Sequence, residues 1–119
     1  MSNNIILDKT YSFAVKTVKL SQYLVDEKKE YVLSKQILRS GTSIGANTEE
    51  AIGGCSKKDF IYKLNIAYKE ARETKYWLRL LKDTGYISID EFDSLFEELG
   101  QILKILFTII KKSKENEQR

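Results

Sequence analysis

Apolar residues recur along the chain in four separate segments, at alternating spacings of three and four residues. This spacing gathers apolar side chains on one face of an α-helix, whereas a half-buried strand would alternate apolar and polar positions. The pattern predicts helices over about residues 7–25, 30–52, 57–84 and 89–112. Short connections between long amphipathic helices favour antiparallel neighbours, so we expect an all-α fold, an antiparallel up-down-up-down four-helix bundle.

The predicted core stripe differs in clarity between the helices. The third helix has the most regular one, formed by Phe60, Leu64, Ala67, Ala71, Thr74, Leu78 and Leu81. In the first helix we expect the stripe to comprise Tyr11, Ala14, Val18, Ser21 and Val25, with Phe13, Leu20 and Leu24 beside it.

Glycine and capping residues mark the predicted helix ends. Gly53 and Gly54 should end the second helix in the left-handed conformation that glycine adopts without steric cost. Gly85 supplies the stop of the third helix. Serine side chains should cap the starts of the third and fourth helices. Ser56 should cap the third, and Ser88 should cap the fourth in a capping box with Glu91. The polar residues 113–119 are expected to fray.

Length and composition restrict the class of protein. A chain of 119 residues without proline suits one helical domain over residues 1–119. The apolar runs are far shorter than the ~20 residues that span a bilayer, so we expect no membrane segment and a cytoplasmic location.

The residue types for catalysis are mostly missing. With Cys55 as the only cysteine and no histidine, the chain has no means to build an internal disulfide, a zinc site or a cysteine–histidine nucleophile. We therefore expect no catalytic, cofactor-binding or metal-binding residues, and Cys55 to be a small thiol in a loop. A magnesium or manganese site built from carboxylates alone remains possible, and the alternative is that these carboxylates form ion pairs with Arg39 and Lys35. The four carboxylates are Glu49, Glu50, Glu70 and Glu73.

The turn near residues 53–56 should fold the second helix back along the third. Ser40 then faces Ala71 and Ile44 faces Ala67, with Gly41 and Gly45 allowing the two backbones to approach closely. The same register brings Arg39 near Glu70 and Glu73, and Gln36 near Thr74. This arrangement predicts a partly buried polar layer whose ion pair fixes the helix register.

One flank of the third helix is basic and aromatic and carries no carboxylate. Lysine and arginine neutralise phosphates and tyrosine stacks on unpaired bases, so the flank is a candidate surface for RNA or single-stranded nucleic acid. A solvated helix face has a similar pattern and remains the alternative. The candidate binding residues are Lys58, Tyr68, Lys69, Arg72, Lys75, Tyr76, Arg79 and Lys82.

Two other surfaces are candidates for protein contacts. The opposite flank of the third helix mixes acids with large apolar groups around Trp77, a pattern that would suit an adaptor docking a protein partner. The fourth helix has more apolar groups than one seam needs, which indicates either a homo-oligomer interface or a wide core. These extra residues are Phe96, Leu103, Phe107 and Ile110.

Three segments resemble a known family. They are 36–51 (QILRSGTSIGANTEEA), 56–60 (SKKDF) and 69–78 (KEARETKYWL), and the chain over most of its length resembles the 23S rRNA intervening-sequence proteins, which are four-helix bundles. The resemblance implies a small bacterial protein with no established enzymatic activity. Family members are similar to the accessory subunit of diversity-generating retroelements, a pentamer that binds a reverse transcriptase and nucleic acid.

The resemblance also implies roles for the polar residues of the second and third helices. Arg39, Ser40, Ser43, Asn47 and Glu73 match the family motif as structural polar residues, and they join Gln36 and Glu70 in the predicted layer. The leading hypothesis is thus a non-enzymatic homo-oligomer, with a pentamer favoured, that binds RNA or another nucleic acid.

Overall fold

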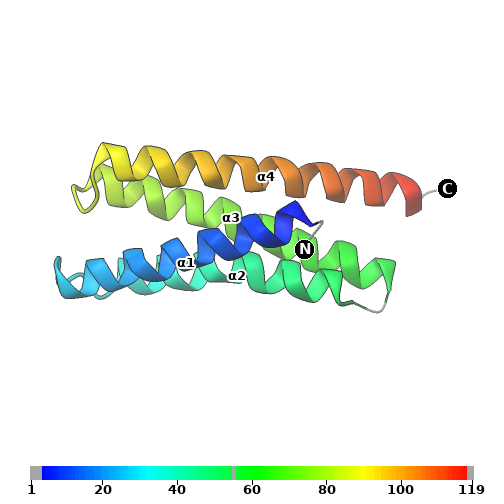
Figure 1. Ribbon diagram of the computed structural model, residues 1–119, viewed down its shortest axis with the longest axis horizontal. Coiled ribbons are helices and arrows are strands. Elements are labelled where there is room, and N and C mark those ends of the chain that lie inside the picture. Colours follow the sequence, from blue (N-terminus) through cyan, green and yellow to red (C-terminus); the bar gives the residue numbers. More distant parts are fainter. Residues whose placement is uncertain (1–3, 55, 118–119) are drawn as a thin grey trace.

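The computed structural model describes residues 4–54 and 56–117. Four helices make up these residues: α1 (Ile5–Asp26), α2 (Leu33–Ile52), α3 (Lys57–Asp83) and α4 (Ile89–Glu117). They form the expected all-α bundle, 51 Å long, with successive helices antiparallel (Figure 1). Contacts join α1 to α2, α2 to α3, α3 to α4 and α4 to α1, so the edge between α1 and α2 lies opposite the edge between α3 and α4. Cys55 lies outside the described residues.

The predicted caps of α3 and α4 are confirmed. The Ser56 hydroxyl accepts a hydrogen bond from the Asp59 N–H at 3.1 Å, and the Ser88 hydroxyl accepts one from the Glu91 N–H at 3.1 Å. The Glu91 carboxylate accepts the Ser88 N–H in return at 3.2 Å, which completes the capping box. Gly85 has a φ of +83°, the left-handed conformation expected where α3 stops.

The connection between α1 and α2 uses a lysine where a glycine would be usual. Lys29 has a φ of 55°, and the Glu30 N–H donates to the Leu24 carbonyl at 2.9 Å, which closes the end of α1. The Glu30 carboxylate then accepts the Ser34 N–H at 2.8 Å. Glu30 therefore caps α2 from outside, and the helix begins at Leu33 instead of the predicted residue 30.

One predicted helix end is right in position but wrong in conformation, since α2 ends at Ile52 as expected, and another is wrong in position. Gly53 ends α2 with φ −85° and ψ 2°, so α2 stops there without the left-handed glycine that we expected. Helix α4 continues to Glu117, past the predicted end at residue 112. The prediction ended α4 where its apolar stripe ended, but lysine and glutamate are good helix formers and allow a formed helix to continue.

The core stripe of α1 is rotated from the predicted one. Tyr11 is 69% exposed and Val18 38%, although both were expected in the core. Two threonines occupy the interior in their place, and the hydroxyls of Thr10 and Thr17 each donate to a carbonyl of the preceding turn at 2.8 Å. These hydrogen bonds satisfy the hydroxyls within α1, so they can be buried at little cost. The buried residues of α1 are Ile6, Thr10, Phe13, Thr17, Leu20, Ser21 and Leu24.

Gly41 and Gly45 of α2 face α1, whereas we expected them to face α3. A β-carbon on Gly41 would lie 2.5 Å from Cγ2 of Thr17, and one on Gly45 would lie 3.3 Å from the Thr10 carbonyl oxygen. The glycines thus permit close approach of α2 to α1 instead of α3. On the α3 side, the Ser40 and Thr74 hydroxyls share a buried hydrogen bond of 2.9 Å.

Candidate nucleic-acid interface

A groove runs along the surface between α3 and α4, and basic and aromatic side chains line it. Its first part is a cavity of about 370 Å³ to which α4 contributes an apolar wall, Leu103. Helix α3 contributes the other lining residues, and all of them belong to the predicted binding set: Tyr68, Arg72, Lys75, Tyr76 and Arg79. The structure therefore brings five of the eight predicted residues together in one concave surface.

The groove continues toward the end of α4. A second cavity, of about 410 Å³, is lined by Asn65 and Tyr68 of α3 and by four residues of α4: Phe107, Ile110, Lys111 and Lys114. Tyr68 lines both cavities, so they adjoin. From Asn65 to Arg79 the groove follows about 21 Å of α3 at a rise of ~1.5 Å per residue.

Aromatic rings are partly exposed along this groove. The rings of Tyr68 and Phe107 lie 6.3 Å apart with planes inclined by 46°, which joins α3 to α4 across the groove. Tyr76 packs edge-on against Trp77 at 5.1 Å. Tyr76 and Phe107 are each 55% exposed, so both present ring surface to solvent. Rings held in this way can stack on other planar groups.

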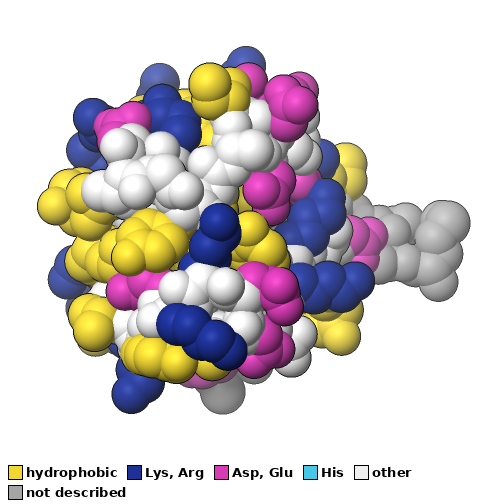
Figure 2. Space-filling view, turned by 90° about the vertical axis from the view of Figure 1, so that its left-hand side faces the viewer, with side chains coloured by type: hydrophobic (Ala, Val, Ile, Leu, Met, Phe, Trp, Pro, Cys, Tyr) yellow, Lys and Arg dark blue, Asp and Glu magenta, His cyan; other side chains and the backbone are white. Residues whose placement is uncertain are grey.

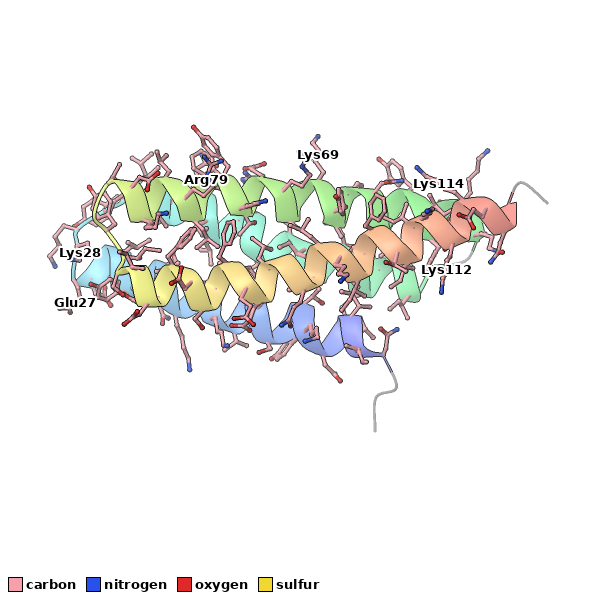
Figure 3. All side chains as sticks on the ribbon, turned by 90° about the horizontal axis from the view of Figure 1, so that it is seen from above. Glu27, Lys28, Lys69, Arg79, Lys112 and Lys114 are labelled. Atoms are coloured by element: carbon pink, nitrogen blue, oxygen red, sulfur yellow. The ribbon has the colours of Figure 1, made fainter. Side chains whose placement is uncertain are left out.

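Most cations of the groove have no acidic partner. Among the side chains described within residues 4–54 and 56–116, no carboxylate forms an ion pair with Arg72, Arg79, Lys111 or Lys114, and all four side chains are exposed. Lys75 lies over the Phe96 ring of α4 at 5.3 Å, which anchors its stem at the groove. Lys114 lies on the side of α4 toward α3, while Lys112 points to the opposite side (Figure 3). The lining of the two cavities is therefore basic, while Glu115 lines a neighbouring hollow of α4 together with Phe107 and Lys111.

Three predicted residues do not join this groove. Lys58 and Lys69 are exposed but line neither cavity, and Lys69 points away from α4 (Figure 3). The ammonium of Lys82 lies 4.3 Å from the centre of the Phe92 ring and 3.6 Å from Asp83. Lys82 is thus engaged in contacts with its own chain.

The α4 side of the groove was not predicted as a binding surface. Phe107 and Ile110 were assigned to an oligomer interface or a wide core, and Lys111 and Lys114 were not among the predicted binding residues. Phe107, Lys111 and Lys114 are spaced by four and three residues, which places them on one face of α4. That spacing was the signal available in the sequence.

The predicted ion pair lies on the other flank of α3. Arg39 of α2 donates to both oxygens of Glu70 at 3.3 Å and to Glu73, whose carboxylate also accepts the Trp77 indole N–H at 2.9 Å. Gln36 accepts from Arg39 at 3.3 Å. The Trp77 hydrogen bond and the guanidinium outweigh desolvation and lower the pKa of Glu73. Desolvation of Arg39 is likewise outweighed, by the hydrogen bond and charge of Glu73 and the charge of Glu70, and its pKa is raised.

The remaining polar residues of the predicted layer bond mainly within α2. The Ser43 hydroxyl donates to the Arg39 carbonyl at 2.7 Å, and the Asn47 amide donates to the Ser43 carbonyl at 2.9 Å. Ser40 is the member that bonds to Thr74, the position we predicted for Gln36. Trp77, the centre of the predicted protein-docking flank, is partly buried with its indole donor occupied.

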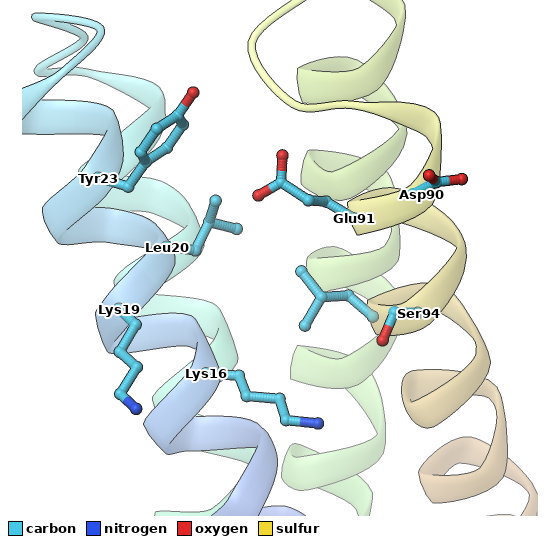
Figure 4. A pocket seen from close by; sticks show the side chains of 8 residues that line it. Lys16, Lys19, Leu20, Tyr23, Asp90, Glu91 and Ser94 are labelled. Carbon is cyan, nitrogen blue, oxygen red and sulfur yellow. The ribbon is translucent and has the colours of Figure 1, made fainter.

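Other surfaces of the bundle mix charges of both signs. The groove between α1 and α4 forms a cavity of about 540 Å³ lined by Lys16 and Lys19 of α1 and by Asp90 and Glu91 of α4. The Glu91 carboxylate points toward Leu20 and Tyr23 of α1, whereas Asp90 points away from α1 (Figure 4). Lys16 forms an ion pair with Glu98 at 2.6 Å. Acidic, basic and apolar side chains are interspersed at the end of the bundle that holds the α1–α2 and α3–α4 connections (Figure 2). The α3–α4 groove differs because its lining contains no carboxylate.

The four carboxylates considered for a metal site make different contacts. Glu70 and Glu73 bind Arg39, and Glu50 pairs with Lys63 at 2.8 Å. Glu49 lines a shallow cavity between α1 and α2. Across the described part of the chain, no group of three or more histidine, cysteine, aspartate or glutamate side chains is arranged to hold a metal ion.

Comparison with known proteins places the chain in a family. The family model described as 23S rRNA-intervening sequence protein matches residues 2–108. The chain belongs to this family. A solved structure from Bacteroides thetaiotaomicron VPI-5482, described as a protein with unknown function from the S23 ribosomal protein family, is 54% identical and superposes with a TM-score of 0.89. The match covers 90% of this chain and 99% of that one. None of the curated proteins compared with the chain matches it.

Membership of the family confirms the predicted resemblance and leaves the function open, since the solved relative is described as having unknown function. Among the described residues of this family member, no helix is long and apolar enough to cross a membrane.

Proposed function

We propose that this protein is a non-enzymatic, homo-oligomeric bundle of the cytoplasm that binds RNA or another nucleic acid in the α3–α4 groove. The observation that carries the proposal is the pairing of cations that lack an acidic partner with partly exposed rings along one groove. The cations are Arg72, Arg79, Lys111 and Lys114, and the rings belong to Tyr68, Tyr76 and Phe107.

The electrostatic part of the interaction has a predictable size. Each phosphate that a cation neutralises releases counterions, and the logarithm of the binding constant falls with the logarithm of salt by ~0.7 per contact for a single strand. Four cations therefore give a slope of roughly −3. No carboxylate lines either cavity, so the four cations are placed to meet phosphates.

Self-association is supported by a second apolar face on α1. Tyr11, Val15 and Val18 are exposed and are spaced by four and three residues, so they form one stripe on the outer side of the bundle. This stripe lies away from the α3–α4 groove, because α1 packs beside α2 and α4 and Tyr11 lines a cavity with residues of α2. Copies joined through α1 would leave the groove open, and the family resemblance favours five copies.

Fluorescence anisotropy with a labelled single-stranded RNA and a structured RNA, at several salt concentrations, tests the proposed function. We expect binding at low salt that weakens with a slope near −3. Absence of binding at low salt, or binding that salt does not change, would contradict it. Co-purification from the native host is the second arm: a protein that stays bound after nuclease treatment would support the adaptor alternative instead.

A further inference from the structure

The shape of the groove restricts the form of nucleic acid that fits it. The two cavities measure about 370 and 410 Å³, the lower end of the size range of small-molecule pockets. Each is large enough for one nucleoside and too small for a double helix. A duplex would rest on the rim and touch only the longest cations.

The lining residues of the groove suit base faces, which a duplex hides. The first cavity has an apolar wall at Leu103 and an exposed ring at Tyr76. The second has an apolar wall at Ile110 and an exposed ring at Phe107. Paired bases are stacked on one another and show only their edges in the grooves of the helix. Unpaired bases can stack on aromatic rings, and every base has a face for this contact.

The position of Tyr68 divides the groove in two. Its ring lines both cavities and packs against Phe107, so it stands at their boundary. Cations flank the boundary on both sides, with Arg72 and Arg79 in the first cavity and Lys111 and Lys114 in the second. The exposed amide of Asn65 lies in the second cavity and is able to donate to or accept from a base edge.

We propose that the groove holds two consecutive unpaired nucleotides of a single strand, one base in each cavity, with Tyr68 between the bases. This inference rests on the proposed function and adds to it the form of the ligand. The cations on either side then neutralise the phosphates of the same strand, and base identity matters little, because stacking does not depend on sequence.

The test compares strands that share phosphates but differ in bases. Anisotropy is measured at one salt concentration with single-stranded RNA, single-stranded DNA, an abasic sugar-phosphate strand and an RNA duplex of equal length. We expect both single strands to bind at least five-fold more tightly than the abasic strand and the duplex. Equal affinity for the abasic strand or the duplex would overturn the two-base arrangement.

Substitutions at Tyr68 provide the matched arm. Tyr68→Leu removes the ring and should weaken single-strand binding by roughly 5- to 150-fold, the equivalent of ~1–3 kcal/mol for one stacked base. Tyr68→Phe keeps the ring and should bind like the wild type. Tyr62→Leu is the control, because Tyr62 is 62% exposed on α3 and lines neither cavity. Circular dichroism melts establish that each variant is folded.

The outcomes separate this inference from the proposed function. If Tyr68→Leu binds single strands as the wild type does, while Arg72→Gln weakens binding to every probe, the groove binds phosphates only and the two-base arrangement is wrong. If the wild type binds none of the probes at low salt, both proposals are wrong.

Discussion

Thr17 of α1 occupies the space that a side chain at Gly41 of α2 would need. A β-carbon on Gly41 would lie 2.5 Å from Cγ2 and 2.8 Å from Oγ1 of Thr17. Thr17 is buried, and its hydroxyl donates to the Phe13 carbonyl at 2.8 Å, so it has little freedom to move. The close contact between α1 and α2 therefore depends on a glycine at this position.

Replacing this glycine should destabilise the bundle. We expect Gly41→Ala to lower the free energy of unfolding by up to about 2 kcal/mol, since overpacking costs ~1–3 kcal/mol and the better helix propensity of alanine returns ~1 kcal/mol. Gly100→Ala is the control and should stabilise α4 by up to ~1 kcal/mol, because nothing lies within 4 Å of its added carbon. Urea unfolding measures both changes. In a Thr17→Ala background the penalty of Gly41→Ala should shrink, because only the β-carbon of residue 17, at 3.1 Å, then remains close to the added carbon; an unchanged penalty there would contradict the steric explanation.

The ion-pair network should make stability depend on pH. Because the pKa of Glu73 is lowered in the folded protein, its contribution is complete above the ordinary glutamate value of ~4.3 and is lost as the pH falls through the folded value. We expect Glu73→Gln to cost about 1–2 kcal/mol at neutral pH and progressively less below about pH 4. Urea unfolding between pH 7 and 3 measures this gap. Glu97→Gln, at an exposed residue without an ion pair, is the control; a Glu73→Gln gap that does not change with pH would exclude the charge as its cause.

The stripe on α1 should hold copies of the protein together. Val15→Glu combined with Val18→Glu places two charges on this stripe, and we expect native mass spectrometry to show monomers where the wild type forms oligomers. Val32→Glu is the matched control, since Val32 is 68% exposed in the connection outside the helices. An unchanged subunit number in the double variant would show that α1 is not the interface.

The sequence pattern predicted those features that depend on local chemistry. Ser56, Gly85 and the Ser88–Glu91 pair act at the ends where their chemistry predicted a cap or a stop. The rotation of α1 was not predictable in this way, because Tyr11 and Val18 are more apolar than Thr10 and Thr17, and only the tertiary fit to Gly45 and Gly41 selects the threonines.

Only the α3 side of the candidate site could be predicted from the sequence, because the other side depends on how the helices pack. The charge pattern of α3 gave Arg72 and Arg79, but a groove needs a second wall, and which face of α4 supplies Phe107 and Lys111 depends on the packing of the two helices. Lys82 contacts the ring of Phe92 across the interface, which the spacing of α3 alone does not reveal.

The proposed RNA site implies that the predicted cations contribute unequally to binding. Arg72→Gln should weaken RNA binding by about 1–3 kcal/mol at moderate salt, because a charged hydrogen bond to phosphate is lost. Lys58→Gln and Lys82→Gln should each change the affinity less than three-fold, since Lys58 lies outside the groove and Lys82 contacts Phe92 and Asp83. Filter-binding titrations compare the three variants. A larger effect from Lys58 than from Arg72 would place the ligand on the outer face of α3.

The salt dependence of binding by a groove variant tests the central claim most directly. The variant carries glutamine at Arg72, Arg79, Lys111 and Lys114, and a control carries glutamine at four exposed lysines off the groove: Lys19, Lys28, Lys35 and Lys57. Both lose four charges, so a general effect of net charge would alter them equally. We predict that the slope of log affinity against log salt falls from roughly −3 to near zero in the groove variant and stays within about one unit of the wild type in the control. Equal slopes in the two variants would contradict binding in the α3–α4 groove.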